Sequence, residues 1–223
     1  MTPTLKQDQE LKKYLRGVLK YRETYEEAYD HILTALEKET DETNFTKTIN
    51  RVIAEEFGGP NGLVEMEESC YKTTAKEAIK QQFSNFKSNF KSIKLIYTLL
   101  LLAIIYYTFN LITLDVSTLL LLLSVVCFAP AAIMVNRYYY TGFYTKDTKK
   151  SIKDKIFYEL ASKPVTLIWL AFIFTMTGKR EPGVNLLVAQ YPIVTSLIFV
   201  LTILYVVSFH KLNQEEIKLY KAM

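Results

Sequence analysis

Two uncharged stretches decide the fold of this chain: LIYTLLLLAIIYYTFNLITL at residues 95–114 and VSTLLLLLSVVCFAPAAIMV at residues 116–135, separated only by Asp115. At about 1.5 Å of rise per residue, a helix of this length measures roughly 30 Å, the thickness of a bilayer's hydrocarbon core. A soluble helix that is buried on all sides rarely runs this far, and two in succession are rarer still. The pair therefore predicts a transmembrane hairpin over residues 93–136.

Two further apolar runs predict a second transmembrane hairpin over residues 164–210. The first run, between Lys163 and Lys179, has fifteen uncharged residues, about 22 Å of helix and therefore short of a full crossing. The second run, residues 184–209, is uncharged for twenty-six residues. We expect four transmembrane helices and a polar tail at residues 211–223, and a re-entrant third segment is the main alternative.

The charges are divided unevenly along the chain and predict its orientation in the membrane. Residues 1–90 hold 13 Lys or Arg against 16 Asp or Glu, whereas residues 91–223 hold 14 against 7. Positive charges flank the first apolar stretch on its N-terminal side and recur in residues 137–163, which places both segments on the cytoplasmic side. The first thirty residues have no apolar signal region, so we expect both termini in the cytoplasm and the chain in an inner membrane.

The first 68 residues predict an all-helical bundle of three short helices. Apolar residues recur there at three- and four-residue spacing, which places each set on one helical face. The three sets are Leu11, Leu15 and Val18; Tyr25, Ala28, Tyr29, Ile32 and Leu36; and Phe45, Ile49, Val52, Ile53 and Phe57. Each helix can bury only one face, so we expect the three to share a core. A partner-binding groove on the same bundle is the open alternative.

The turn Phe57-Gly58-Gly59-Pro60 is predicted to close the bundle. Glycines after an apolar helix are a C-terminal stop signal, and a proline fits the first turn of the helix that follows. Beyond this turn, residues 69–92 predict one or two connecting helices, which could continue into the first transmembrane segment.

The N-terminal bundle resembles the HAAS domain, a small helical module of bacterial membrane proteins that is often associated with PadR-type regulators. The resemblance covers residues 10–68. Its residues are Leu11, Tyr14 and Leu15, then His31 and Leu36, then the turn Phe57-Gly58-Gly59-Pro60 with Leu63 and Glu67 behind it. The resemblance implies a bacterial protein whose cytoplasmic module interacts with another protein in signalling.

The basic segment at residues 137–163 is a candidate membrane-surface element. From about Asp147 onward its apolar residues share one helical face, which is typical of an amphipathic helix on an anionic leaflet. The alternative is that this helix docks on the acidic bundle. The candidate membrane-surface contacts are Arg137, Tyr138, Tyr139, Tyr140, Lys149, Lys150, Lys153 and Lys155.

The sequence offers no signature of catalysis, and it predicts neither a metal site nor a cofactor. Only two histidines and two cysteines are present, and no metalloprotease, P-loop or nucleophile-elbow motif occurs. Glu65, Glu67 and Glu68 have the helix spacing of a solvated face. The acidic balance of residues 1–90 argues against nucleic-acid binding.

The sequence therefore predicts a multi-pass membrane protein with a cytoplasmic protein-interaction module. Its expected partners are the lipid bilayer and either a cytoplasmic protein or a second copy of the chain. We expect a signalling or regulatory role and no enzymatic activity. A transporter, or an accessory subunit of a membrane complex, is the alternative, although no ionisable residue lies in the middle of an apolar run, where ion pathways usually have one.

Overall fold

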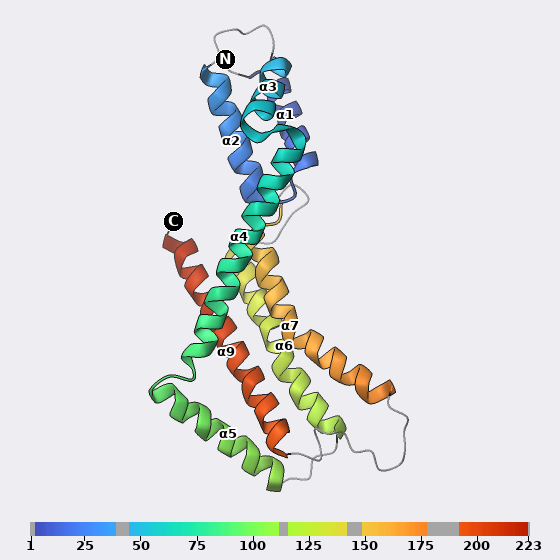
Figure 1. Ribbon diagram of the computed structural model, residues 1–223, viewed down its shortest axis with the longest axis vertical. Helices are drawn as coiled ribbons and strands as arrows, with labels where there is room; N and C mark the ends of the chain where they lie inside the picture. Colours follow the sequence, from blue (N-terminus) through green and yellow to red (C-terminus); the bar gives the residue numbers. More distant parts are fainter. Residues whose placement is uncertain (1–2, 39–44, 112–115, 142–148, 178–191, 223) are drawn as a thin grey trace. The chain divides into compact units, whose positions relative to one another are not determined.

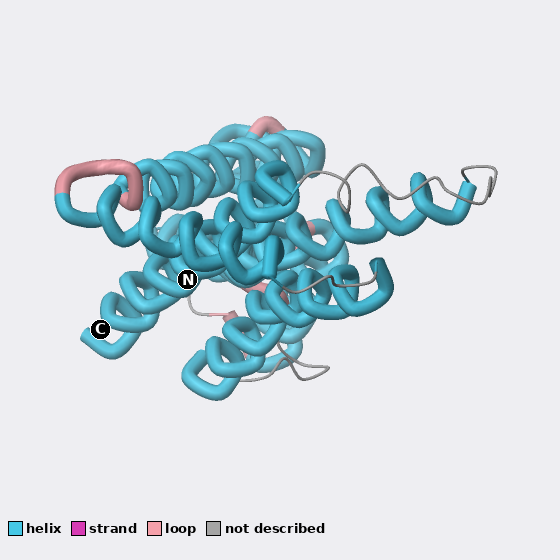
Figure 2. The backbone as a smooth tube through the Cα atoms, turned by 90° about the horizontal axis from the view of Figure 1, so that it is seen from below, coloured by secondary structure: helices cyan, strands magenta, loops and turns pink. Residues whose placement is uncertain are grey.

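The computed structural model describes residues 3–38, 45–111, 116–141, 149–177 and 192–222, and these residues confirm the all-α prediction (Figures 1 and 2). Every regular element among them is a helix, and the one bridge of strand type joins Tyr21 to Lys150. The helices are α1 (Leu5–Val18), α2 (Arg22–Lys38), α3 (Phe45–Phe57), α4 (Gly59–Ser88), α5 (Ile93–Leu111), α6 (Val116–Thr141), α7 (Ile152–Thr177) and α9 (Pro192–Ala222).

The chain divides into two compact units. Unit 1 consists of residues 1–77 and 144–156, and unit 2 consists of residues 78–143 and 157–223. The helices α4 and α7 each contribute residues to both units. Unit 1 therefore contains the expected N-terminal bundle together with residues from the basic segment that follows α6.

Unit 1 has an apolar core that α1, α2, α3 and the start of α4 share. The three- and four-residue periodicity predicted these helical faces correctly, because the residues on each stripe are the buried ones. The core residues are Leu11, Leu15, Leu19, Ala28, Ile32, Leu36, Phe45, Ile49, Val52, Ile53 and Leu63, with Val18, Tyr25, Tyr29 and Phe57 partly buried against them.

Glycine geometry shapes the turn between α3 and α4. Gly58 and Gly59 have φ angles of 72° and 88°, in the left-handed region where a side chain is strained. Gly62 is constrained differently: a Cβ atom at this position would overlap the carbonyl oxygen of Phe57. The turn thus needs glycine twice for backbone conformation and once for close approach.

The connecting helix α4 is one continuous helix that ends before the first apolar helix begins. After Ser88 the chain makes a turn in which Ser92 has a φ of 52°, and α5 starts at Ile93. The hydroxyl of Thr98 on α5 donates a hydrogen bond to the carbonyl oxygen of Asn89 in this turn, at 3.0 Å. The possibility that the connecting helix continues without a break into the first transmembrane segment is therefore wrong.

Among the described residues of unit 2, three helices are long and apolar enough to cross a membrane. They span Ile93–Leu111, Thr118–Thr141 and Pro192–Lys218. Within this unit α9 packs against both α5 and α6 (Figure 1). The shared core includes Leu119, Cys127 and Phe199, and the ring of Phe199 lies edge-on against Phe109, with centroids 5.1 Å apart.

The described residues contain three helices that qualify as membrane spans, and the expected second hairpin, residues 164–210, lies partly outside the described residues. Two expected boundaries differ in the structure. The expected amphipathic helix and the third apolar run form one helix, α7, which continues through Pro164. The expected tail after residue 210 is a helical extension of α9 as far as Ala222.

Candidate functional site

A buried carboxylate from α4 holds the connection between α1 and α2. The side chain of Glu67 is only 4% exposed. Its Oε1 atom accepts hydrogen bonds from the amides of Lys20 at 2.7 Å and Tyr21 at 2.9 Å, and from the hydroxyl of Thr24 at 2.8 Å. A negative charge at this position also complements the N-terminal end of the α2 dipole. The expectation of a solvated Glu67 is wrong, because helix spacing alone does not show that α4 packs beneath this turn.

The starts of α2 and α7 cap one another within unit 1. The amide of Arg22 donates to the carbonyl oxygen of Lys150 at 3.0 Å. In return the carboxylate of Glu23 accepts the amide of Ile152 at 3.0 Å and the hydroxyl of Ser151. Each helix thereby satisfies backbone donors that its own first turn leaves free. We refer to residues 149–152 and their partners on α2 as the reciprocal cap.

Lys149 adds a third connection at the reciprocal cap. Its ammonium group donates to the carbonyl oxygen of Arg16 at 2.8 Å and to that of Leu19, both at the C-terminal end of α1. A cation is favourable there because the carbonyls at a helix C-terminus carry partial negative charge. Partial burial lowers the pKa of Lys149, and the carboxylate of Glu67 opposes that shift. Residues 149–152 are therefore attached to both α1 and α2.

A polar network joins the outer faces of α1 and α2. The carboxylate of Asp8 accepts the ammonium of Lys12 at 2.8 Å and the hydroxyl of Tyr29 at 2.5 Å. Lys12 also lies 5.1 Å from the centre of the Tyr29 ring. The hydrogen bonds from Lys12 and then Tyr29 hold the pKa of Asp8 below its usual value of 3.8.

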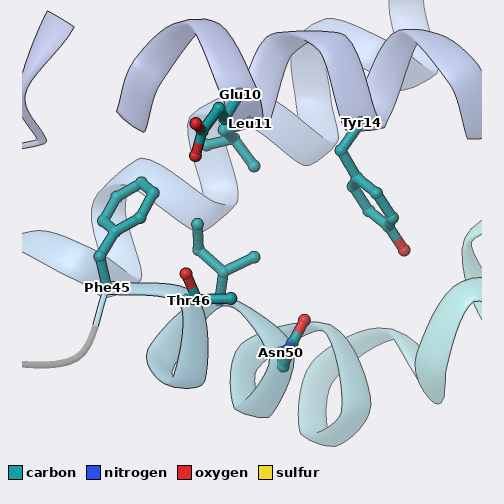
Figure 3. A pocket seen from close by; sticks show the side chains of 7 residues that line it. Glu10, Leu11, Tyr14, Phe45, Thr46 and Asn50 are labelled. Atoms are coloured by element: carbon teal, nitrogen blue, oxygen red, sulfur yellow. The ribbon is translucent and has the colours of Figure 1, made fainter. Parts of the chain in front are cut away.

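An open pocket lies between α1 and α3, with a cavity volume of about 160 Å³. Figure 3 shows Glu10 and Tyr14 on α1 facing Thr46 and Asn50 on α3. Leu11, Phe45 and Ile49 complete the lining. The floor is thus apolar core and the rim is polar, an arrangement that suits an aliphatic or aromatic side chain carried on a partner. We call it the α1–α3 pocket.

The structure places the predicted membrane-surface residues in different environments. Lys150 and Lys153 are exposed, and Tyr139 is 79% exposed. Lys149 instead binds backbone carbonyls of unit 1. The predicted bundle-closing turn, Phe57-Gly58-Gly59-Pro60, joins α3 to α4, with Pro60 in the first turn of α4.

Arg137 differs most from its expected role. Its side chain is 4% exposed, and its guanidinium lies 4.2 Å from the centre of the Phe157 ring and 3.4 Å from Asn213 Oδ1. These contacts are all within unit 2. Arg137 is a buried packing residue here because α6 continues to Thr141, four residues beyond it, and carries the side chain against α7 and α9.

Sequence reasoning missed the roles of Glu67, Glu23 and Lys149. The acid in the first turn of α2 is a recognisable capping residue, but it caps a helix 129 residues away. Within the part of the chain that the structure describes, no group of His, Cys, Asp and Glu side chains is arranged to hold a metal ion. Comparisons with protein families, with curated proteins and with solved structures found no match to this chain.

Proposed function

We propose that this chain is a membrane-anchored regulatory protein whose unit 1 binds a cytoplasmic protein. The observation that carries the proposal is the reciprocal cap. Through it, the segment between two apolar helices is built into the same compact unit as the N-terminal bundle. A partner that binds or reshapes the bundle would therefore act directly on the segment that connects α6 to α7.

The reciprocal cap also supports a membrane topology. Residues 149–152 and residues 16–24 share hydrogen bonds, so both segments lie on the same side of a membrane. Between them the chain must then cross an even number of times, which fits one crossing by α5 and a return by α6.

Contacts within unit 2 extend the same reasoning to the C-terminal end. Glu215 on α9 accepts hydrogen bonds from Gln81 at 3.0 Å and Asn85 at 3.2 Å, both on the polar helix α4. The C-terminal end of α9 then lies on the same side of the membrane as α4. The start of α9, at Pro192, lies on the opposite side of the membrane. Some part of residues 157–191 must cross to reach Pro192, which supports four crossings in total.

The charge distribution supports a cytoplasmic position for unit 1. Lys87, Lys91 and Lys94 precede α5, and Lys149, Lys150, Lys153 and Lys155 follow α6, as the positive-inside rule requires of cytoplasmic segments. The proposed location is the inner membrane of a bacterium, with both termini in the cytoplasm. The HAAS-like features of residues 10–68 support the same placement and a signalling role.

The α1–α3 pocket is the proposed place of partner contact, and it can be tested by filling it. Thr46 is an exposed rim residue, so Thr46→Trp should block the pocket without entering the core. Thr73→Trp on the exposed face of α4 is the matched control. We expect full-length wild type and Thr73→Trp, purified from gently solubilised membranes, to retain the same bound protein, and Thr46→Trp to lose it. Recovery of no stable partner and no self-association, or equal recovery with Thr46→Trp, would contradict the proposal.

An accessory subunit of a membrane complex is the second candidate, and the exposure of α5 favours it. Of the residues in the 18-residue apolar stretch of α5, only 6% are buried within the chain, against 39% for the corresponding stretch of α9. A helix that its own chain covers so little has room for a neighbouring membrane subunit as well as for lipid. Extraction in native lipid discs tests this candidate: a second membrane protein in constant proportion would support it, and discs that hold this chain alone would remove it.

A further inference from the structure

We propose that the C-terminal half of α4 is a binding site for anionic lipid headgroups at the membrane surface. The site is an exposed stripe of alternating apolar and basic side chains, Ile79, Lys80, Phe83 and Lys87, followed by Lys91 and Lys94. It lies outside the α1–α3 pocket and outside the reciprocal cap, and it does not depend on the regulatory role proposed above.

Helical spacing places the stripe on one face. Ile79, Phe83 and Lys87 follow one another at intervals of four residues, and Lys80 lies three residues before Phe83, so the four side chains fall within about 100° of the helix circumference. The opposite face packs against α9. Gln82 is 5% and Asn85 7% exposed there, and Gln82 donates to the carbonyl oxygen of Tyr205 at 3.4 Å. The stripe is thus the face that the described part of unit 2 leaves uncovered.

The two apolar residues of the stripe are both exposed. Ile79 is 55% and Phe83 is 61% exposed. The ammonium of Lys87 lies 5.9 Å from the centre of the Phe83 ring, so the basic and aromatic groups are neighbours. Side chains of this kind, side by side on one face, suit the interface between lipid headgroups and acyl chains, where the ring enters the apolar layer and the lysine remains among phosphates.

Charge and position together select an anionic membrane surface as the occupant. No acidic residue occurs from Ala78 to Leu114, and that interval contains Lys80, Lys87, Lys91 and Lys94. Lys87, the last residue of the stripe on α4, lies six positions before Ile93, where α5, the first candidate membrane span, begins. A second copy of the chain would bring the same positive charges to the contact, and like charges repel. Phosphate headgroups offer both the opposite charge and the apolar layer beneath it.

The test places a fluorescent reporter in the stripe of the full-length chain. Trp169 is the only tryptophan, so Trp169→Phe with Phe83→Trp gives a single probe at the stripe. Ser84→Trp in the same background reports on the adjacent, non-stripe face. The proteins are reconstituted in nanodiscs of acyl-brominated phosphatidylcholine, alone or mixed equally with phosphatidylglycerol. We expect tryptophan at position 83 to be quenched at least twice as strongly in the anionic discs as in the neutral ones, and tryptophan at position 84 to change little.

Charge variants then distinguish a lipid site at the stripe from nonspecific attraction of the whole chain to anionic lipid. Lys80→Gln with Lys87→Gln should abolish the extra quenching, whereas Lys38→Gln with Lys47→Gln, an equal loss of charge at exposed positions of unit 1, should preserve it. Quenching that depends on neither lipid charge nor the stripe lysines would overturn the proposal. A blue-shifted but unquenched probe whose emission depends on the number of chains per disc would also overturn it, because it would identify a protein neighbour.

Discussion

The Oε1 atom of Glu67 lies 2.8 Å from the hydroxyl oxygen of Thr24, and both side chains are buried. The same oxygen receives the amides of Lys20 and Tyr21, so one carboxylate from α4 fixes the turn that precedes α2. That turn also supplies the backbone that binds residues 149–152. The position of Glu67 therefore connects the folding of the bundle with the attachment of the segment after α6.

Replacing Glu67 should loosen this turn specifically. Glu67→Gln keeps one acceptor oxygen but loses the charge, and a buried charged acceptor with three donors is expected to be worth about 1–3 kcal/mol. Hydrogen–deuterium exchange of the full-length protein in detergent should show faster exchange at Lys20 and Tyr21. Glu68→Gln is the control, since Glu68 forms only an exposed pair with Lys72 at 3.2 Å and should change stability by less than about 0.5 kcal/mol. Equal effects of the two substitutions would contradict the role of Glu67.

The reciprocal cap predicts energetic coupling between two positions far apart in sequence. Ser151→Ala removes a hydroxyl at the start of α7 and should cost about 1 kcal/mol, as the loss of a capping residue usually does. Glu23→Ala removes the acceptor of both Ser151 and Ile152. In a double-mutant cycle the double variant should lose less stability than the sum of the two single losses, by at least about 0.5 kcal/mol, because both substitutions delete one shared contact.

The matched cycle pairs Ser151→Ala with Glu26→Ala. Glu26 lies on the same helix as Glu23 but forms only an exposed pair with Arg22 at 3.9 Å. The losses of stability caused by these two substitutions should be additive in the double variant. Thermal unfolding midpoints in detergent are the measurement, and additivity in the cycle with Glu23 would remove the reciprocal cap as an energetic unit.

Two glycines of unit 1 should respond to alanine in opposite directions. At Gly62 a methyl group would meet the Phe57 carbonyl, so Gly62→Ala must displace the α3–α4 turn at a cost of about 1–3 kcal/mol. At Gly17, within α1, nothing lies within 4 Å of the added atom, and alanine should stabilise the helix by up to about 1 kcal/mol. An unfolding midpoint of Gly62→Ala that does not fall would show that the close approach at Gly62 is unimportant.

The helices of the bundle were predictable because each buries a stripe that local spacing reveals. Ile32 and Ile49, for example, are buried because they fall on apolar faces with a period of 3.6 residues. The start of α3 at Phe45 and its end at Phe57 coincide with the ends of the predicted stripe. Local patterns of this kind decide secondary structure and the core of a small bundle.

The candidate site was not predictable in the same way, because its contacts join residues far apart in sequence. Glu67 looks like any exposed acid of an amphipathic helix until α4 is packed beneath the α1–α2 turn. Lys149 belongs to a lysine-rich run typical of a membrane surface, yet its ammonium binds carbonyls of α1. The sequence predicted that an acidic bundle and a basic segment could meet, but charge alone does not select the residues that make the contact.

The Asp8 network predicts an acid-sensitive contribution to the stability of unit 1. Because the pKa of Asp8 is lower in the folded chain than its usual 3.8, its contribution is fully present above about pH 3.8 and is lost as the pH falls through the lower, folded-state value. Asp8→Asn should therefore be less stable than wild type at neutral pH. The difference in free energy of unfolding between the two proteins should become smaller only below pH 3.8. Glu37→Gln, at an exposed position of α2, is the control. A gap between wild type and Asp8→Asn that stays constant down to strong acid would contradict this account.

The shared hydrogen bonds of unit 1 predict which positions face the same side of the membrane. Single cysteines are introduced as Lys38→Cys, Lys153→Cys, Lys218→Cys and Asn110→Cys, after Cys70→Ser and Cys127→Ala remove the native thiols. In intact cells an impermeant maleimide should label only position 110, because the proposed topology places Asn110 near the outer end of α5 and the other three positions in the cytoplasm. Permeabilisation should expose positions 38, 153 and 218 together.

Each possible disagreement in this labelling experiment has a distinct meaning. Opposite sides for positions 38 and 153 would show that residues 149–152 cannot bind the bundle, and the reciprocal cap would not exist in the membrane. Opposite sides for positions 38 and 218 would show an odd number of crossings, so that residues 157–191 do not cross and Glu215 cannot meet Gln81. Agreement of all three requires an even number of crossings. If α5, α6 and α9 each cross once, the proposed fourth crossing would then fall within residues 157–191.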